Sequence, residues 1–356
     1  MRPVYLSQFF AVAAGSMMSA SLALANDFYD KKQITMVIGY NTGGGYDIYA
    51  RIIASALPRY IPGNPTIVPR NMPGAGSAVA ANFLAGAVAR DGLTIGMIGQ
   101  QLSLAQALND PVVKFDMRNF NWLGRVASNV EVTVAWHTSP VKSIADAIDQ
   151  EVTLAATSAG STSHAMPLLV SRVTGAKFRL ITGYPGITGG GLAMERGETQ
   201  GTHATVDGLL FAKRNWLSEG KVSVLVQYAM QRHPAFPNTP AMTELGKTND
   251  EKAILTLFAS PAEIGRSVIT PPGVPAQLVE ILRNSFAAML DDPAFEADLK
   301  SKNLTFEPMK GTELQQLIST ALNISPALVE RAKYLGRDEK WVRASAGARD
   351  CIIEGC

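Results

Sequence analysis

The chain has 356 residues, and its 32 Lys and Arg against 30 Asp and Glu give a formal net charge of only +2 at pH 7. A near-neutral chain without basic runs gives no reason to expect nucleic acid or an anionic membrane surface as a partner. Its 2 cysteines, Cys351 and Cys356, lie at the end of the chain. Zinc sites built on cysteine clusters are therefore excluded, and whether these two cysteines form a disulfide is left open.

Residues 1–25 have the pattern of a secretory signal peptide. A single basic residue, Arg2, precedes an apolar segment that ends in Ala23-Leu24-Ala25. Serines interrupt the segment, which is short for a membrane span, and no later stretch has about 18 uninterrupted apolar residues. We therefore expect cleavage near Ala25 and a product that is free in an exported compartment and does not cross the bilayer. Roughly 330 residues remain, enough for two domains.

The stretch from Ile34 to Leu57 predicts a strand, a glycine loop and a helix. Gly43, Gly44 and Gly45 let backbone N–H groups approach a ligand closely, and we expect Asp47 to be the N-cap of the helix. Such a loop favours a small anion, most simply a carboxylate. The competing interpretation is a bare connection between a strand and a helix. The phosphate motif G-x-x-x-x-G-K-[ST] is absent, which argues against a nucleotide.

Strands and helices alternate further along the chain. Residues 65–69 and 94–99 are typical of strands and residues 78–89 of a helix, which indicates parallel βαβ units. Ligands bind at the carboxyl ends of such strands, so Gln100 and Gln101 are expected on the same rim as the glycine loop.

A second unit repeats this outline. Residues 152–156 predict a buried strand, and a polar turn follows before a helix over residues 165–174. The turn ends in Ser161, Thr162, Ser163 and His164, whose hydroxyl and N–H groups form a second candidate anion site. Two such sites on separate domains predict a cleft between them.

The remaining segments complete an α/β pattern. Strands are expected near residues 130–134, 177–182 and 222–226, and a glycine-rich loop at residues 188–191. Apolar residues at helical spacing predict a helix over residues 276–290 and a last helical segment over residues 314–335 that breaks near Pro326.

Several short motifs follow one another in a familiar order. They are Gly43-Gly44-Gly45-Tyr46-Asp47 with Ala50-Arg51, Asn71-Met72-Pro73-Gly74-Ala75-Gly76, Asp91-Gly92, Gly160-Ser161-Thr162-Ser163-His164, Tyr184 with the glycines after it, and Pro271-Pro272-Gly273-Val274-Pro275. In these motifs the chain resembles the periplasmic receptors of tripartite tricarboxylate transporters, the Bug or TctC-like family. The likeness covers nearly the whole chain after the signal peptide.

The resemblance implies a type II periplasmic-binding-protein fold, with two α/β lobes around a ligand cleft and two crossover strands between them. Residues 26–130 and 262–345 would form the first lobe, residues 131–261 the second, and residues 346–356 a C-terminal tail. The implied protein is a monomeric receptor without a cofactor or metal that passes a small organic carboxylate to membrane subunits.

The resemblance also implies ligand-binding residues. Gly43, Gly44, Gly45, Tyr46 and Asp47 would hold one carboxylate, and Ser161, Thr162, Ser163, His164 and Tyr184 would meet the solute from the second lobe. Gln100 and Gln101 are candidate ligand-binding residues because of their position at a strand end, not because of the resemblance. Two positions depart from the family pattern. Pro185 stands where many relatives have lysine, and Gln200 precedes a segment that usually carries an acid.

Two alternatives remain open from the sequence. A receptor of this kind could feed a signalling partner, and Ser161 with His164 could serve a hydrolase. The hydrolase is disfavoured because there is no G-x-S-x-G motif, and the four histidines lack the spacing of metal ligands. Di- and tricarboxylates, aromatic acids and amino acids all remain possible solutes.

Overall fold

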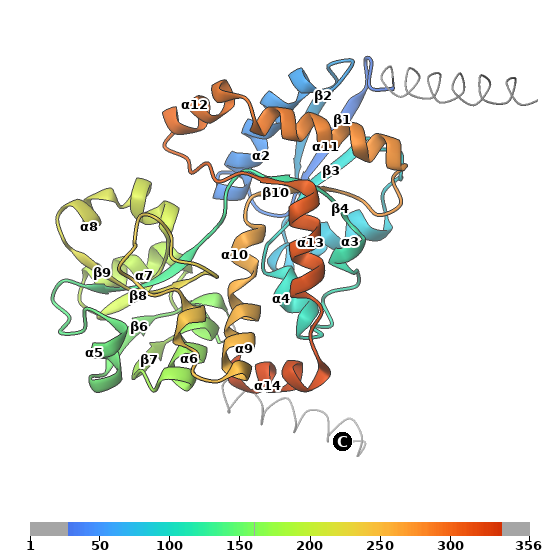
Figure 1. The fold of residues 1–356 in the computed structure, drawn as a ribbon. Helices are drawn as coiled ribbons and strands as arrows, with labels where there is room; N and C mark the ends of the chain where they lie inside the picture. The colour runs from blue at the N-terminus through green and yellow to red at the C-terminus, as the bar shows by residue number, and fades with distance from the viewer. Residues whose placement is uncertain (1–27, 160, 337–356) are drawn as a thin grey trace, which may run out of the picture.

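The computed structural model describes residues 28–159 and 161–336, which form two α/β lobes, each around its own sheet (Figure 1). The expected signal peptide, the last residues assigned to the first lobe and the C-terminal tail with both cysteines lie outside the described residues. Among the described residues, no helix is both long and apolar enough to cross a membrane.

The first sheet has six strands in the order β11-β4-β10-β3-β1-β2. β1 runs parallel to β2 and β3, as the sequence predicts, whereas β10 runs antiparallel to β3 and β4. The strands are β1 (Gln33–Ile38), β2 (Thr66–Asn71), β3 (Thr94–Met97), β4 (Asn121–Arg125), β10 (Ser267–Thr270) and β11 (Met309–Lys310).

The second sheet has five strands in the order β7-β6-β8-β5-β9. β6 runs parallel to β7 and β8, and β5 pairs antiparallel with β8 and β9. The strands are β5 (Glu131–Trp136), β6 (Val152–Ala155), β7 (Phe178–Ile181), β8 (Gly201–Thr205) and β9 (Val222–Tyr228).

Helices cover both faces of the sheets (Figure 1). They are α2 (Gly45–Ala56), α3 (Ala78–Gly86), α4 (Leu102–Ala107), α5 (Ile144–Asp149), α6 (Thr162–Thr174), α7 (Gly186–Glu195), α8 (Arg214–Ser218), α9 (Asn249–Ala259), α10 (Pro261–Ile264), α11 (Ala276–Leu290), α12 (Pro293–Ser301), α13 (Gly311–Ala321) and α14 (Pro326–Gly336). Shorter helical turns are η1 (Leu57–Tyr60), η2 (Ala75–Ser77), η3 (Met117–Asn119), η4 (Gly208–Ala212) and η5 (Met242–Leu245).

Alternation along β1 explains how the first lobe is held together. Ile34, Met36 and Ile38 pack with α2 and α11 on one face, while Val37 packs with α3 on the other. All four side chains are fully buried. Burial of each such side chain contributes about 1.5–3 kcal/mol to folding, so β1 fixes the position of the loop that follows it.

Two segments cross between the lobes side by side. The first connects β4 to β5, and the second runs from α10 through Gly265 and Arg266 into β10. The Arg266 N–H donates to the Ala127 carbonyl oxygen at 2.8 Å, and the Asn129 N–H donates to the Ala262 carbonyl oxygen at 3.0 Å. The crossovers are therefore hydrogen-bonded to each other, and the two lobes share one paired hinge.

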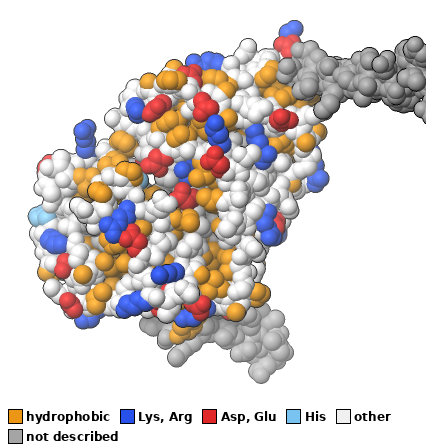
Figure 2. Space-filling model, in the orientation of Figure 1, with side chains coloured by type: hydrophobic (Ala, Val, Ile, Leu, Met, Phe, Trp, Pro, Cys, Tyr) orange, Lys and Arg blue, Asp and Glu red, His pale blue; other side chains and the backbone are white. Residues whose placement is uncertain are grey.

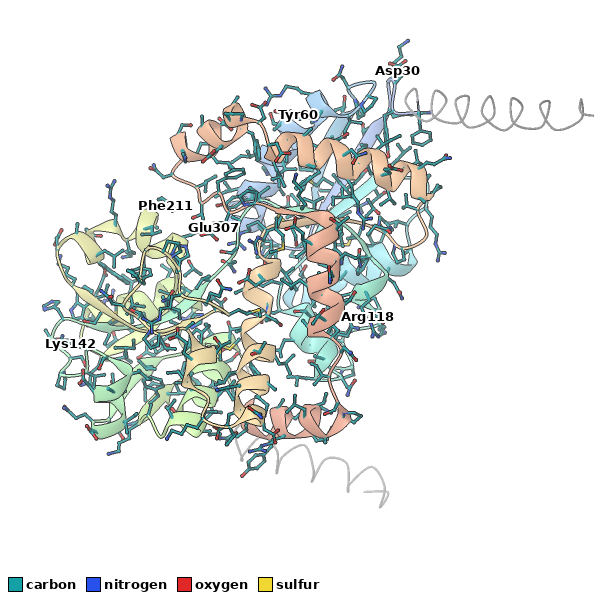
Figure 3. The ribbon with its side chains drawn as sticks, in the orientation of Figure 1. Asp30, Tyr60, Arg118, Lys142, Phe211 and Glu307 are labelled. Carbon is teal, nitrogen blue, oxygen red and sulfur yellow. The ribbon has the colours of Figure 1, made fainter. Side chains whose placement is uncertain are left out.

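The segment between α12 and β11 provides a further connection between the lobes. Figure 3 shows Glu307 of this segment at the boundary between them. The Glu307 Oε1 atom lies 2.9 Å from Nε2 of His233, in the loop after β9, and the Thr305 hydroxyl donates to Asp207, just after β8. This segment of the first lobe is thereby tied to the second.

Three local expectations were wrong. The N-cap of α2 is Gly44, and Asp47 is the third residue of the helix. The helix after the second turn begins at Thr162 instead of residue 165. Residues 188–191 are not a loop but part of α7, because missing side chains let this helix approach its neighbours: a Cβ on Gly190 would lie 2.5 Å from Oγ1 of Thr202.

Candidate functional site

The glycine bend after β1 is shaped by the Asp47 carboxylate. Gly43 has a φ of +85°, a conformation that favours glycine, and its N–H donates to Oδ2 of Asp47 at 2.9 Å. The Asp47 side chain reaches back over the first turn of α2 to Gly43, the residue before the N-cap. The bend is therefore closed by a contact between the loop and the helix that follows.

Asp47 is almost completely occupied by donors from the protein. It is 2% exposed, its Oδ1 atom accepts from Nε of Arg51 at 2.9 Å and from Nδ2 of Asn71 at 2.8 Å, and the same Asn71 amide donates to the Tyr40 carbonyl. The hydrogen bond from Arg51 is the largest cause that lowers the pKa of Asp47 to about 2, against the opposing effect of burial. The carboxylate thus holds the loop after β1 to the end of β2.

Tyr46 and Gln100 point toward the hinge. The Gln100 N–H donates to the Tyr46 hydroxyl oxygen at 3.1 Å, and its side-chain Nε2 donates to the Asn129 carbonyl at 3.1 Å. The Arg266 guanidinium lies 4.1 Å from the centre of the Tyr46 ring, within the range of a cation–π contact. Both predicted residues are buried and connect the first lobe to the crossovers.

The second polar turn is organised by its own hydroxyl groups. The Ser161 hydroxyl donates to the Ser158 carbonyl at 2.7 Å, and Oγ of Ser163 accepts from the Thr157 N–H at 3.0 Å. Ser163 and His164 are each 6% exposed in the first turn of α6. Ser161 and Thr162, at the start of the helix, are less buried.

A cavity of about 490 Å³ lies between the lobes and brings part of the predicted site together. Gly76 and Gln101 line it from the first lobe, and Ser161 and Thr162 line it from the second. The other predicted residues are not among those lining it: Gly43, Gly44, Gly45, Tyr46, Asp47, Gln100, Ser163, His164 and Tyr184. The Tyr184 hydroxyl instead donates to Oε2 of Glu198 at 3.4 Å.

Sequence reasoning missed the apolar part of this cavity. Beside the polar residues, the cavity is lined by Leu104 of α4, by Leu108 at the C-cap of α4, by Met166 of α6 and by Phe258 of α9. The sequence signal that could have indicated this apolar wall was the position of α4 directly after Gln100 and Gln101. A second hollow of about 580 Å³, between α9 and α13, contains none of the predicted residues.

Asp116 fixes α4 against the chain that follows it. Its Oδ1 atom accepts from Nε2 of Gln106 at 2.8 Å and from Nε of Arg118 at 2.9 Å. The hydrogen bond from Arg118 is the largest cause that lowers the pKa of Asp116 to about 2. The pKa of an aspartate in the unfolded chain is about 3.9. The stabilisation by Asp116 is therefore present above about pH 4 and is lost as the pH falls toward 2.

We expect Asp116→Asn to lower the free energy of unfolding at pH 6 by about 1–2 kcal/mol, allowing for the partial exposure of the ion pair. The difference from wild type should shrink by at least about half at pH 2.5, because wild-type Asp116 is then partly protonated. Urea unfolding at both pH values measures this. A difference of equal size at both would contradict it.

The face shown in Figure 2 carries Lys and Arg side chains intermixed with Asp and Glu over both lobes. Within the described ranges 28–159 and 161–336, no group of three or more His, Cys, Asp or Glu side chains is placed to hold a metal ion. The cavity itself is lined mainly by uncharged groups. The site is thus a cavity between two lobes with few charged groups in its wall.

Two α/β lobes that are joined by paired crossovers and have a pocket between them define the class of type II periplasmic binding proteins. A family model described as the tripartite tricarboxylate transporter family receptor matches residues 49–333. The chain therefore belongs to this family, whose members are solute-binding receptors.

Individual relatives agree with this assignment. The chain is 24% identical over 340 residues to a Cupriavidus necator protein described as the UPF0065 protein in the gbd 5′ region, covering 91% of this chain and 96% of that protein. A Polaromonas TctC solute-binding protein, solved without ligand, shares the fold with a TM-score of 0.64 at 19% identity over 85% of this chain and 99% of its own. An R. palustris protein solved with adipate has a TM-score of 0.61 at 20% identity, over 86% and 97%.

Proposed function

We propose that this protein is a periplasmic receptor that captures a small organic carboxylate between its lobes and delivers it to the membrane subunits of a tripartite tricarboxylate-type transporter. The observation that carries the proposal is the cavity shared by Gly76 and Gln101 from one lobe and Ser161 and Thr162 from the other. The family assignment and the adipate held by a structural relative support a carboxylate as the solute.

The polar residues that line the cavity suit an anion. Ser161 is the N-cap of α6, a helix of 13 residues, and Thr162 is its first residue. The backbone N–H groups and the dipole at a helix N-terminus favour negative charge. The Gln101 amide faces the same cavity from the opposite lobe, so the carboxylate would contact both lobes and favour the closed arrangement.

The other parts of the proposal follow from the sequence. Residues 1–25 would direct export and be removed, and the mature chain would act as a monomer without enzymatic activity. The glycine bend and Asp47 would support the site by shaping the first-lobe rim, since Asp47 is occupied by Arg51 and Asn71.

A panel of mono- and dicarboxylates tested by thermal shift and calorimetry would measure this function. A solute at about 100 times its dissociation constant should add about 2.7 kcal/mol to the folded state. We expect Thr162→Val to weaken binding of the best solute about tenfold, because a hydrogen bond to a charged group is lost.

Thr320→Val is the matched control. It makes the same chemical change as Thr162→Val, but Thr320 lines the second hollow. It should leave the affinity unchanged. Failure of every carboxylate to bind, or equal affinities for Thr162→Val and wild type, would overturn the proposal.

A further inference from the structure

The polar and apolar residues that line the cavity lie at different places along its helices. Gln101 and Thr162 stand at the starts of α4 and α6, and apolar lining residues follow one to two turns further along both helices, which gives the cavity a polar end and an apolar end. Gly76, Gln101, Ser161 and Thr162 form the polar end. The rest of the wall includes Leu104, Leu108, Val112, Met166, Phe258 and Ala332. A solute with polar groups at one end only would match this distribution.

The apolar end is covered by α14. This helix follows α13 of the first lobe but packs on the second, where Ala332 is fully buried in a cluster with Met166 and Phe258. The Arg172 guanidinium donates to the Leu335 carbonyl at 3.0 Å, and Arg331 pairs with Asp250 at 2.6 Å. Contacts with α6 and α9 therefore hold α14 in place as part of the cavity wall.

Charge at the covered end does not favour a second carboxylate. Among the described residues that line the cavity, the charged ones are Asp110 and Lys333. Nζ of Lys333 lies 2.7 Å from Oε1 of Glu330, and Oδ1 of Asp110 accepts from the Val112 N–H at 3.0 Å. The cation among these lining residues is thus already paired with Glu330, so a second carboxylate brought here would lose its hydration without gaining a free counter-charge.

The polar end contains a buried acceptor that makes no hydrogen bond to the residues that the structure describes. This acceptor is Oε1 of Gln101. An amide turned by 180° presents its NH₂ group in place of the oxygen. A carboxylate beside Thr162 and Ser161 would accept from that group, and the buried amide would then be satisfied.

From these observations we infer that the solute is an amphipathic monocarboxylate, a class narrower than the organic carboxylates of the proposed function, on which this inference rests. Its carboxylate lies between Gln101 and the start of α6. Its apolar chain or ring lies along α4 and ends under α14. Each methylene moved from water into the apolar end should strengthen binding about fourfold.

Calorimetry with butyrate, octanoate and suberate at neutral pH tests this assignment. Octanoate should bind on the order of a hundredfold more tightly than butyrate, because four more methylenes are buried. Suberate has the same carbon number as octanoate but a second carboxylate, and it should bind at least about tenfold more weakly than octanoate.

The outcomes separate the two proposals. Suberate binding as tightly as octanoate, or octanoate no more tightly than butyrate, would overturn the amphipathic solute and leave the carboxylate receptor standing. Failure of these three and of the wider carboxylate panel would overturn the receptor function itself.

Leu108→Gln places a polar group in the apolar wall and should weaken octanoate at least about tenfold, and butyrate by a smaller factor, because the shorter chain buries less surface there. Leu192→Gln is the matched control, since Leu192 is 41% exposed on α7 and does not line the cavity. It should bind both acids as wild type does. Equal affinities of Leu108→Gln and wild type for octanoate would contradict the assignment.

Ala105→Leu provides a second variant that retains apolar character and fills part of the same wall. It should reduce the preference for octanoate over butyrate, because less of the longer chain can be buried. If Leu108→Gln fails to fold, the ratio of the octanoate and butyrate affinities of Ala105→Leu is the test. A ratio equal to that of wild type would overturn the inference.

Discussion

Replacement of Gly265 by alanine should lower the free energy of unfolding by about 3–5 kcal/mol, because positive-φ strain and a steric clash add together. Gly265 has φ +47° and ψ −130° at the end of α10. A Cβ placed there would lie 2.2 Å from the Ala127 carbonyl oxygen and 2.8 Å from Cα of Ser128. Both atoms belong to the backbone of the other crossover, so no side-chain rotation relieves the contact. Urea unfolding of the purified variant measures the loss.

Gly86→Ala is the matched control for this substitution. Gly86 is the last residue of α3, is absent from the residues with positive φ, and has no heavy atom within 4 Å of a Cβ built on it. Alanine there should stabilise the protein by up to about 1 kcal/mol through helix propensity. If Gly265→Ala were as stable as Gly86→Ala, the two crossovers could not approach each other as closely as described.

The regular elements of the fold were largely predictable from the sequence. The strand before the glycine bend, the helix that follows it and the break at Pro326 are all present, since α13 ends at Ala321 and α14 begins at Pro326. Ser143 caps α5 as expected and accepts from the Asp146 N–H. These features depend on local periodicity, caps and proline, which a short stretch of sequence contains.

Features that depend on distant contacts were not predictable. Residues 188–191 form part of a helix because Gly190 and Gly191 pack against Thr202 and Trp216. β8 was missed because its sequence, Gly201 to Thr205, is small and polar, although it is almost entirely buried between β5 and β6. In both cases tertiary packing overrides the local preference.

The candidate site shows the same division. The end of a predicted strand pointed to Gln101, and a polar turn before a helix pointed to Ser161 and Thr162; these residues line the cavity. The apolar wall of α4 and the cover provided by α14 required the arrangement of the lobes. The role of Asp47 also needed the structure, because Asn71, its partner, is 24 residues away in the chain.

Replacement of Asp47 by alanine should lower the free energy of unfolding by about 3 kcal/mol, because a buried carboxylate with charge-assisted hydrogen bonds is removed and its donors lose their acceptor. The Gly43 N–H in the loop after β1 and the Asn71 amide at the end of β2 each lose a partner. Chemical unfolding at pH 7 measures the effect. The free energy of solute binding should change less than the free energy of unfolding, since Asp47 does not line the cavity.

Asp298→Ala tests whether burial is the cause. Asp298 pairs with Lys302 in the same i,i+4 relation as Asp47 with Arg51, but its side chain is 47% exposed whereas that of Asp47 is 3% exposed. An exposed pair of this kind contributes less than about 0.5 kcal/mol, so this variant should be nearly as stable as wild type. Equal losses in the two variants would mean that Asp47 acts as an ordinary surface ion pair. A loss of stability in Asp47→Ala alone would instead show that the buried carboxylate stabilises the glycine bend. In that case water does not replace the carboxylate as the acceptor for the Gly43 N–H and the Asn71 amide.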